Sequence, residues 1–128
     1  MHYEIGVKLG HVLWRKLFPD EREKADENFI RLTYDLIDNG KYPLAAKLLD
    51  FACEDFKTFS NEMKKLILVV NRAQAYKWMG QERRCREIMQ AVDWSAKGDQ
   101  FCLADAVLAE DWSRAVKIMK RIGHDGPI

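Results

Sequence analysis

The chain has 128 residues, of which 48% are hydrophobic and 32% are charged, and its formal net charge is +1. This length and composition are typical of one ordered, helix-rich domain and exclude an intrinsically disordered protein. The near-zero charge also excludes the strong overall field with which a basic protein attracts nucleic acid.

Helical periodicity runs through almost every long segment, whereas no segment alternates as a half-buried strand does. Gly40 and Gly80 fit the position just after a helix, and Pro43 fits the first turn of one. The pair Ser60-Asn61 is expected to provide one N-cap, and Asp99 is expected to provide another. The pattern predicts an all-α fold whose seven helices span residues 3–18, 20–38, 43–56, 61–79, 82–93, 100–109 and 112–122.

A short pattern of small and large apolar residues recurs in three of these helices. It begins at Ala45, Cys85 and Ala115, so its copies lie 40 and then 30 residues apart, and apolar residues follow three, four and seven positions later. A tight turn precedes each copy, and the helix before that turn also offers a small residue, which is Thr33, Ala73, and Ala104 or Ala106. Small residues at a crossing let two antiparallel helices approach closely, so the pattern predicts three helical hairpins.

These positions resemble the tetratricopeptide repeat, a helix–turn–helix unit of 34 residues. Gly40, Tyr42, Ala45 and Ala52 match its turn and second helix, and the later hairpins match in part, because Glu110 replaces the turn glycine. The resemblance implies a right-handed α-solenoid, in which stacked hairpins curve around a concave groove. A related solenoid of helical hairpins is the alternative.

We interpret residues 1–128 as a single helical-repeat domain. Its predicted parts are a leading or capping helix over 1–19, hairpins over 20–59, 60–95 and 96–123, and a polar tail over 124–128. The leading helix carries the repeated pattern at Gly10, Leu13, Trp14 and Leu17, like the second half of an earlier hairpin. It is therefore either a dedicated cap or the edge of a longer array.

No grouping of reactive side chains predicts an enzyme, a metal site or a cofactor. The cysteines Cys53, Cys85 and Cys102 are widely spaced, which argues against disulfides and zinc and for a reducing, cytoplasmic location. The histidines lie near the chain ends, so a catalytic His–Asp pair would need the termini folded together. We expect these histidines at the surface or partly buried. No apolar run approaches the roughly 18 residues of a membrane span. Trp94 falls in a predicted loop and is the tryptophan to test for exposure.

The first helix of each hairpin is expected to line the concave groove. The candidate partner-binding residues on this face are Glu27, Ile30, Tyr34, Ile37, Val70, Asn71, Gln74, Lys77 and Lys97. Asn71 and Gln74 suit the backbone of a bound peptide, and Lys77 suits a carboxylate. Ordinary packing between helices is the alternative for the aliphatic members. Some tetratricopeptide domains clamp a terminal carboxylate, and the resemblance places Asn71 and Lys97 at two of the clamp positions.

The sequence thus predicts a non-catalytic protein–protein interaction module that binds a peptide or helix of a partner. One alternative is a nucleic-acid-associated regulatory protein that uses the basic face of residues 64–86, with Arg83, Arg84 and Arg86 at its centre. Another is a regulatory or oligomerisation fragment of a larger protein. No membrane role is expected, and the oligomeric state stays open.

Overall fold

A computed structural model describes residues 2–55, 59 and 61–125, and the fold is reported for these residues. They form seven α-helices and no strand, as the periodicity predicts. The helices are α1 (His2–Leu17), α2 (Arg22–Asp38), α3 (Tyr42–Asp50), α4 (Glu62–Trp78), α5 (Glu82–Gln90), α6 (Asp99–Leu108) and α7 (Trp112–Asp125). Two 3-10 turns, Pro19–Glu21 and Trp94–Ala96, and a π-helical segment, Phe51–Asp55, complete the regular structure.

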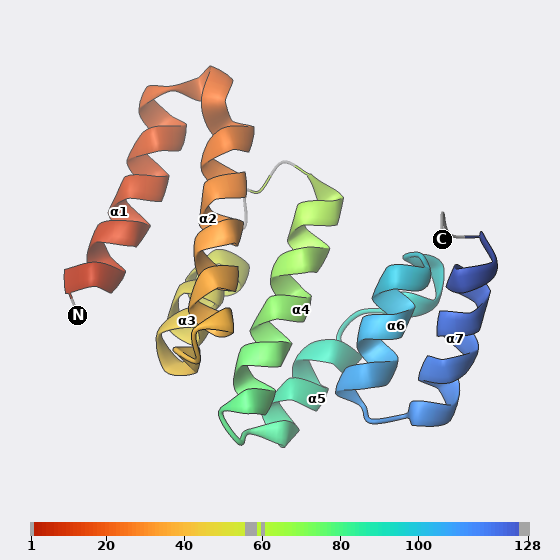
Figure 1. The fold of residues 1–128 in the computed structure, drawn as a ribbon. Helices are drawn as coiled ribbons and strands as arrows, with labels where there is room; N and C mark the ends of the chain where they lie inside the picture. Colours follow the sequence, from red (N-terminus) through yellow and green to blue (C-terminus); the bar gives the residue numbers. More distant parts are fainter. Residues whose placement is uncertain (1, 56–58, 60, 126–128) are drawn as a thin grey trace.

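Successive helices pair through tight turns as α2 with α3, α4 with α5 and α6 with α7 (Figure 1). Helix α4 is central, because it packs against α2, α3, α5 and α6. Helix α1 packs on α2 and α3, and it lies at the opposite end of the molecule from α7 (Figure 1). The last hairpin joins the rest through α6 on α4.

The three hairpin turns share one hydrogen-bond pattern. In each, an amide after the turn bonds to a carbonyl in the last turn of the preceding helix: Lys41 N to Leu36 O (2.8 Å), Gln81 N to Tyr76 O (2.9 Å) and Asp111 N to Ala106 O (2.9 Å). The residue before each amide has a positive φ, which is 75° at Gly40, 89° at Gly80 and 56° at Glu110. These are Schellman-type helix ends, which require a left-handed residue.

The small residues of the repeated pattern lie at the helix crossings. In the first helices, Thr33, Ala73 and Ala106 are completely buried. In the second helices, Ala45 is completely buried and Cys85 and Ala115 are almost completely buried. Each hairpin has its own apolar cluster, and the clusters shrink along the chain. The first is centred on Phe29, Leu48, Leu49 and Leu68, the second on Leu66, Ile88, Met89 and Trp94, and the third on Ala106, Ala115 and Ile118.

Trp94 is buried, although its predicted loop suggested exposure. Its indole Nε1 donates a hydrogen bond to the carbonyl of Met89 at 2.8 Å, and its ring stacks on Phe101. Asp93 accepts a bond from the Ser95 amide and so starts the 3-10 turn. These contacts end α5 at Gln90, three residues before the predicted limit of 93.

Two further predictions at helix ends are wrong, and one is confirmed. Asp99 is not an N-cap: Gly98 takes that position, and Asp99 instead pairs with Arg121 of α7. The expected polar tail begins later, because α7 continues to Asp125, while residues 126–128 lie outside the described part. Asn61 caps α4 as expected, because its side chain accepts a bond from the Lys64 amide.

A buried polar cluster attaches α1 to α2. His11 Nε2 lies 2.9 Å from Asp26 Oδ1, and Arg15 Nη1 lies 3.5 Å from the same oxygen. The His11 ring also packs against Phe29 and Phe59. The expectation that the histidines are at the surface or partly buried is therefore wrong for His11, which is buried. Its pair with Asp26 forms between the neighbouring helices α1 and α2 and does not need the chain ends to meet.

A second polar network joins α3, α4 and α5. Arg72 is buried and donates hydrogen bonds to Asp50, at 2.8 Å, and to Glu54. The Tyr76 hydroxyl donates to the other oxygen of Asp50 at 2.6 Å, and Arg84 bonds to Glu54 at 3.0 Å. These carboxylates explain how the charged Arg72 side chain is accommodated in a buried position.

Candidate functional site: the groove between α4 and α6

A groove of about 230 Å³ lies between α4 and the end of the α6–α7 hairpin that contains its turn. It is lined by Val70, Gln74, Lys77, Trp78, Ala104, Val107, Leu108, Glu110 and Trp112. Val70, Gln74 and Trp78 are spaced four residues apart, so they lie along one face of α4.

Three large apolar side chains around this groove are exposed. The exposed fractions are 48% for Trp78, 39% for Val107 and 57% for Trp112. The Trp78 ring also contacts Tyr42, with 5.8 Å between ring centres, and this contact holds it from the α3 side. Aromatic residues grouped around a concavity are the usual anchors of protein-binding sites, whereas scattered exposed apolar residues are not.

Lys77 closes one end of the groove. Its ammonium donates to the carbonyl of Leu108 and to Glu110 Oε2, both at 3.0 Å, and lies 3.7 Å from Glu82. Burial acts to lower the pKa of Lys77, but the two carboxylates raise it above its ordinary value, so the group stays charged. Carboxylates of this chain thus already pair with Lys77, and its role as a ligand for a partner carboxylate stays a prediction.

Three of the predicted partner-binding residues meet in the groove, namely Val70, Gln74 and Lys77. Two others are covered by the protein itself: Ile37 belongs to the first core at 3% exposure, and Asn71 is buried in α4. Their assignment to a partner surface was wrong, because the apolar faces of α2 and α4 turn toward their own hairpins.

The remaining four predicted residues lie outside the groove. Ile30 packs against the first core, and exposed Glu27 forms an ion pair with Lys64 at 3.2 Å. Tyr34 is exposed on α2 but does not line the cavity. Lys97 is exposed just before α6, whereas the groove lies at the other end of that helix.

The exposed side chains that distinguish the groove were not predicted from the sequence. Trp78, Val107 and Trp112 are not among the residues predicted to bind a partner. The available signals were their positions: Trp78 extends the Val70–Gln74 face by one turn, and Trp112 begins α7 immediately after a hairpin turn. A tryptophan at a helix end next to a turn often has only one face covered.

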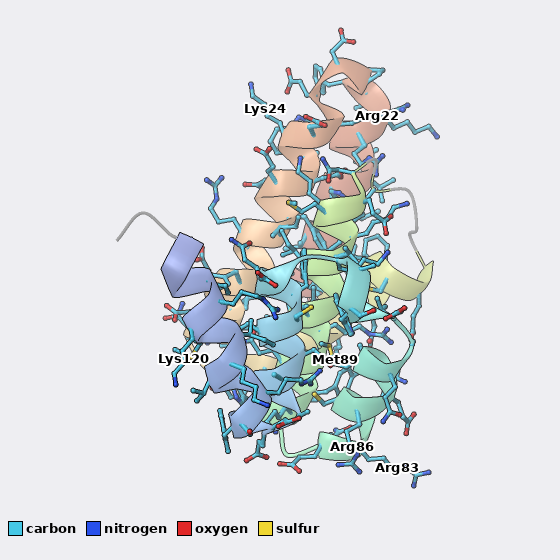
Figure 2. The ribbon with its side chains drawn as sticks, turned by 90° about the vertical axis from the view of Figure 1, so that its right-hand side faces the viewer. Arg22, Lys24, Arg83, Arg86, Met89 and Lys120 are labelled. Carbon is cyan, nitrogen blue, oxygen red and sulfur yellow. The ribbon has the colours of Figure 1, made fainter. Side chains whose placement is uncertain are left out.

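Two of the three central arginines of the alternative site are already paired with carboxylates of this chain. Arg84 lies 3.0 Å from Glu54 and stacks over Tyr76, while Arg83 pairs with Glu87 at 3.3 Å. Figure 2 shows Arg83 and Arg86 close together. A nucleic-acid platform needs a continuous positive track with stacking residues, and this arrangement does not favour one.

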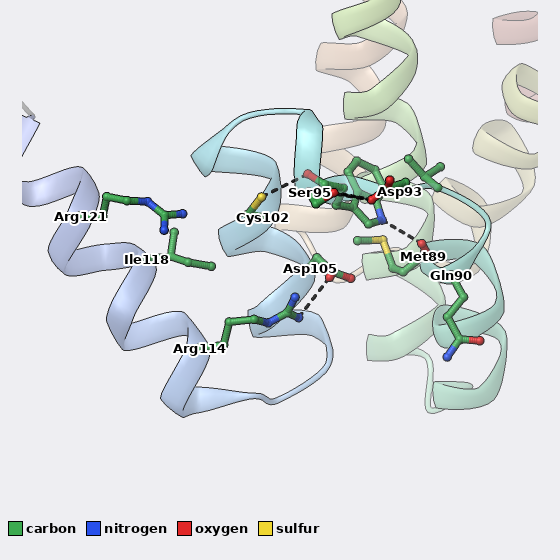
Figure 3. Close-up of a pocket in the computed structure, with 11 residues that line it drawn as sticks. Met89, Gln90, Asp93, Ser95, Cys102, Asp105, Arg114, Ile118 and Arg121 are labelled. Carbon is green, nitrogen blue, oxygen red and sulfur yellow. Dashed lines mark hydrogen bonds and ion pairs between the residues drawn. The ribbon is translucent and has the colours of Figure 1, made fainter.

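A larger cleft, of about 550 Å³, lies between the end of α5 and the α6–α7 hairpin (Figure 3). Its cations are already paired, with Arg114 at 3.1 Å from Asp105 and Arg121 at 2.6 Å from Asp99. Its large apolar residues Met89, Trp94 and Ile118 are buried, unlike those of the α4–α6 groove. A partner would therefore bury little new apolar surface in this cleft.

The thiols do not form a reactive centre. Burial raises the pKa of Cys53 to about 11, which keeps this thiol protonated and weakly nucleophilic. In the described part of the chain, no three metal-ligating side chains of histidine, cysteine or acidic residues come together. None of the described helices is both long and apolar enough to cross a membrane.

Comparisons with known proteins found no matching family model, no matching curated protein and no matching solved structure.

Proposed function

We propose that this chain is a non-catalytic protein–protein interaction module, which binds a short segment of a partner in the α4–α6 groove. The observation that carries the proposal is the grouping of exposed Trp78, Val107 and Trp112 around one concavity. Burying a fully exposed large apolar side chain contributes about 1.5–3 kcal/mol. Each of these three contributes less than that, because it is already partly buried. Three such contacts are enough for a peptide site of moderate affinity.

The size of the groove favours a peptide over a small-molecule ligand. Its 230 Å³ is below the roughly 300–1,000 Å³ that is typical of small-molecule sites, but it accommodates one or two large side chains. Gln74 offers an amide donor and an acceptor beside the apolar walls. The partner segment is therefore a short strand or helix turn with an aromatic or branched aliphatic anchor, whose backbone bonds to Gln74.

The proposed architecture is a right-handed, tetratricopeptide-like α-solenoid. The shared turn pattern at Gly40, Gly80 and Glu110 and the buried small residues at the three crossings support equivalent hairpins. In this arrangement the third hairpin meets the second mainly through α6 and α4, so that the groove opens between two first helices. First helices line the inner face of such solenoids.

Selection from a displayed peptide library tests the proposal. We expect peptides with a large apolar anchor, and the double variant Trp78→Ala/Trp112→Ala should weaken their binding by at least about tenfold. Tyr34→Ala is the matched control, because Tyr34 is an exposed aromatic residue outside the groove. Selected peptides that bind the double variant as tightly as the wild type would refute the site.

A further inference from the structure

Helix α1 presents a broad apolar face to solvent. Its exposed large residues, all between 48% and 65% exposed, are Tyr3, Ile5, Leu9, Leu13 and Leu17, and Phe18 follows directly. The row from Ile5 to Leu17 repeats every four residues, so it forms one continuous ridge that is inclined to the helix axis. Among the α1 side chains that the structure describes, Lys16 is the one exposed charge, because Glu4, Lys8 and Arg15 are partly or fully covered.

The repeated pattern shows what kind of contact this face normally makes. Gly10, Leu13, Trp14 and Leu17 of α1 correspond to Ala45, Leu48 and Leu49 of α3 and to Ala52 of the π-helical segment after it. These four corresponding residues are buried in the first core, whereas Leu13 and Leu17 face solvent. The exposed ridge of α1 is thus a face that packs against a helix in the equivalent position.

We propose that a second copy of this chain supplies that helix, with the two α1 helices packed antiparallel about a two-fold axis. An evenly spaced ridge is complementary to itself in this arrangement. Leu9 of one copy then faces Leu13 of the other, and Leu17 faces Ile5 and Gly6. An added Cβ at Gly6 or Gly10 would have no atom within 4 Å, so the glycines leave open space into which a leucine fits.

Charge decides between this contact and a head-to-tail contact of α1 with α7. The exposed apolar residues of α7, Trp112, Val116 and Met119, are flanked by exposed Lys117 and Lys120. A head-to-tail contact would bring these lysines toward Lys16, and like charges at an interface oppose binding. The α1–α1 contact avoids that repulsion and closes as a dimer instead of growing into a filament.

The mass in solution, measured by light scattering, tests the dimer. The wild-type chain should have twice the 15.0 kDa of a single chain at micromolar concentration. Leu9→Lys/Leu13→Lys should be monomeric, with dimerisation at least tenfold weaker, and with unchanged helical circular dichroism because both residues are exposed. Val116→Lys/Met119→Lys on α7 is the matched control and should remain dimeric. A monomeric wild type, or a dimer lost in the α7 variant alone, would overturn the proposal.

Cross-linking tests the antiparallel orientation without relying on the charged variants. In a chain with Cys53, Cys85 and Cys102 replaced by alanine, a mixture of Leu9→Cys and Leu13→Cys chains should form a disulfide-linked dimer under oxidation. Leu17→Cys alone should not, because the two copies of residue 17 lie at opposite ends of the interface. Rapid linking of Leu17→Cys with itself would exclude the antiparallel arrangement, and so would failure of the mixture to link.

Discussion

Single residues with unusual backbone conformations position the three hairpins. Gly40 and Gly80 take left-handed conformations that cost other residues about 1–2 kcal/mol. Glu110 takes the same conformation without being a glycine, and its side chain pairs with Lys77 across the groove. The residue with the left-handed conformation in the third turn therefore also makes a side-chain contact that joins two hairpins.

Gly80→Ala should lower the free energy of unfolding by about 1 kcal/mol, because alanine resists the φ of 89°. Chemical denaturation provides the measurement. Gln81→Ala, next to it, is the control and should stay within about 0.5 kcal/mol of wild type, because Gln81 is exposed and its side chain does not cap α5. Equal stability of Gly80→Ala and wild type would contradict the Schellman assignment.

His11 should make stability depend on pH. Burial lowers its pKa below 6.5, and Arg15 adds to this, although the hydrogen bond with Asp26 acts the other way. As the pH falls, the unfolded chain therefore binds a proton before the folded chain does. The free energy of unfolding has its full value above about pH 6.5 and falls by up to about 1.4 kcal/mol per pH unit below it. Melting temperatures recorded across this range should fall more steeply for wild type than for His11→Gln. Parallel curves for the two proteins would be evidence against the buried histidine.

At the scale of elements, the Arg72 network is the main polar link between the first two hairpins. Arg72→Ala should lower the free energy of unfolding by about 2 kcal/mol, less than a fully buried pair, because Glu54 is half exposed. Tyr76→Phe should cost about 1 kcal/mol through the lost bond to Asp50. Arg83→Ala is the control, since the Arg83 side chain is 88% exposed, and it should change stability little. An effect of Arg72→Ala no larger than that control would refute the link.

Helix existence and the hairpin turns were predictable because both are encoded locally. Apolar periodicity located all seven helices, and the small residues Thr33 and Ala73 located two of the crossings. For the third crossing the sequence left Ala104 and Ala106 as alternatives, and Ala106 is the completely buried one. The early end of α5 was not predictable, because it depends on Trp94 turning back to the Met89 carbonyl. Helix limits depend on such individual bonds, which residue patterns do not specify.

The candidate site was only partly predictable because it depends on contacts between hairpins. Val70, Gln74 and Lys77 were found from their face of α4, but their neighbours in the groove come from α6 and α7, which lie 27 to 42 residues further along the chain. Ile37 was assigned to the surface because periodicity alone does not say which of two apolar edges of α2 is covered. The pairing of Lys77 with Glu110 depends on the same docking of α6.

For the whole molecule, stability should decrease toward α7. The first core contains Phe29 and several leucines, whereas the third consists of Ala106, Ala115 and Ile118 with few partly buried neighbours. Hydrogen exchange followed by mass spectrometry should show faster opening of α6 and α7 than of α2 and α4, because less apolar area protects them. Uniform protection across all four helices would contradict the packing of the third hairpin.

The central position of α4 has a consequence for the order of folding. The turn contacts join helices adjacent in the chain, so little loop entropy opposes each hairpin, and a helical protein of this kind folds rapidly. The hairpins do not complete their packing independently, however, because α4 packs against the helix pair before it, against its own partner α5 and against α6. The transition state should therefore contain α4, with α1 and α7 joining afterwards.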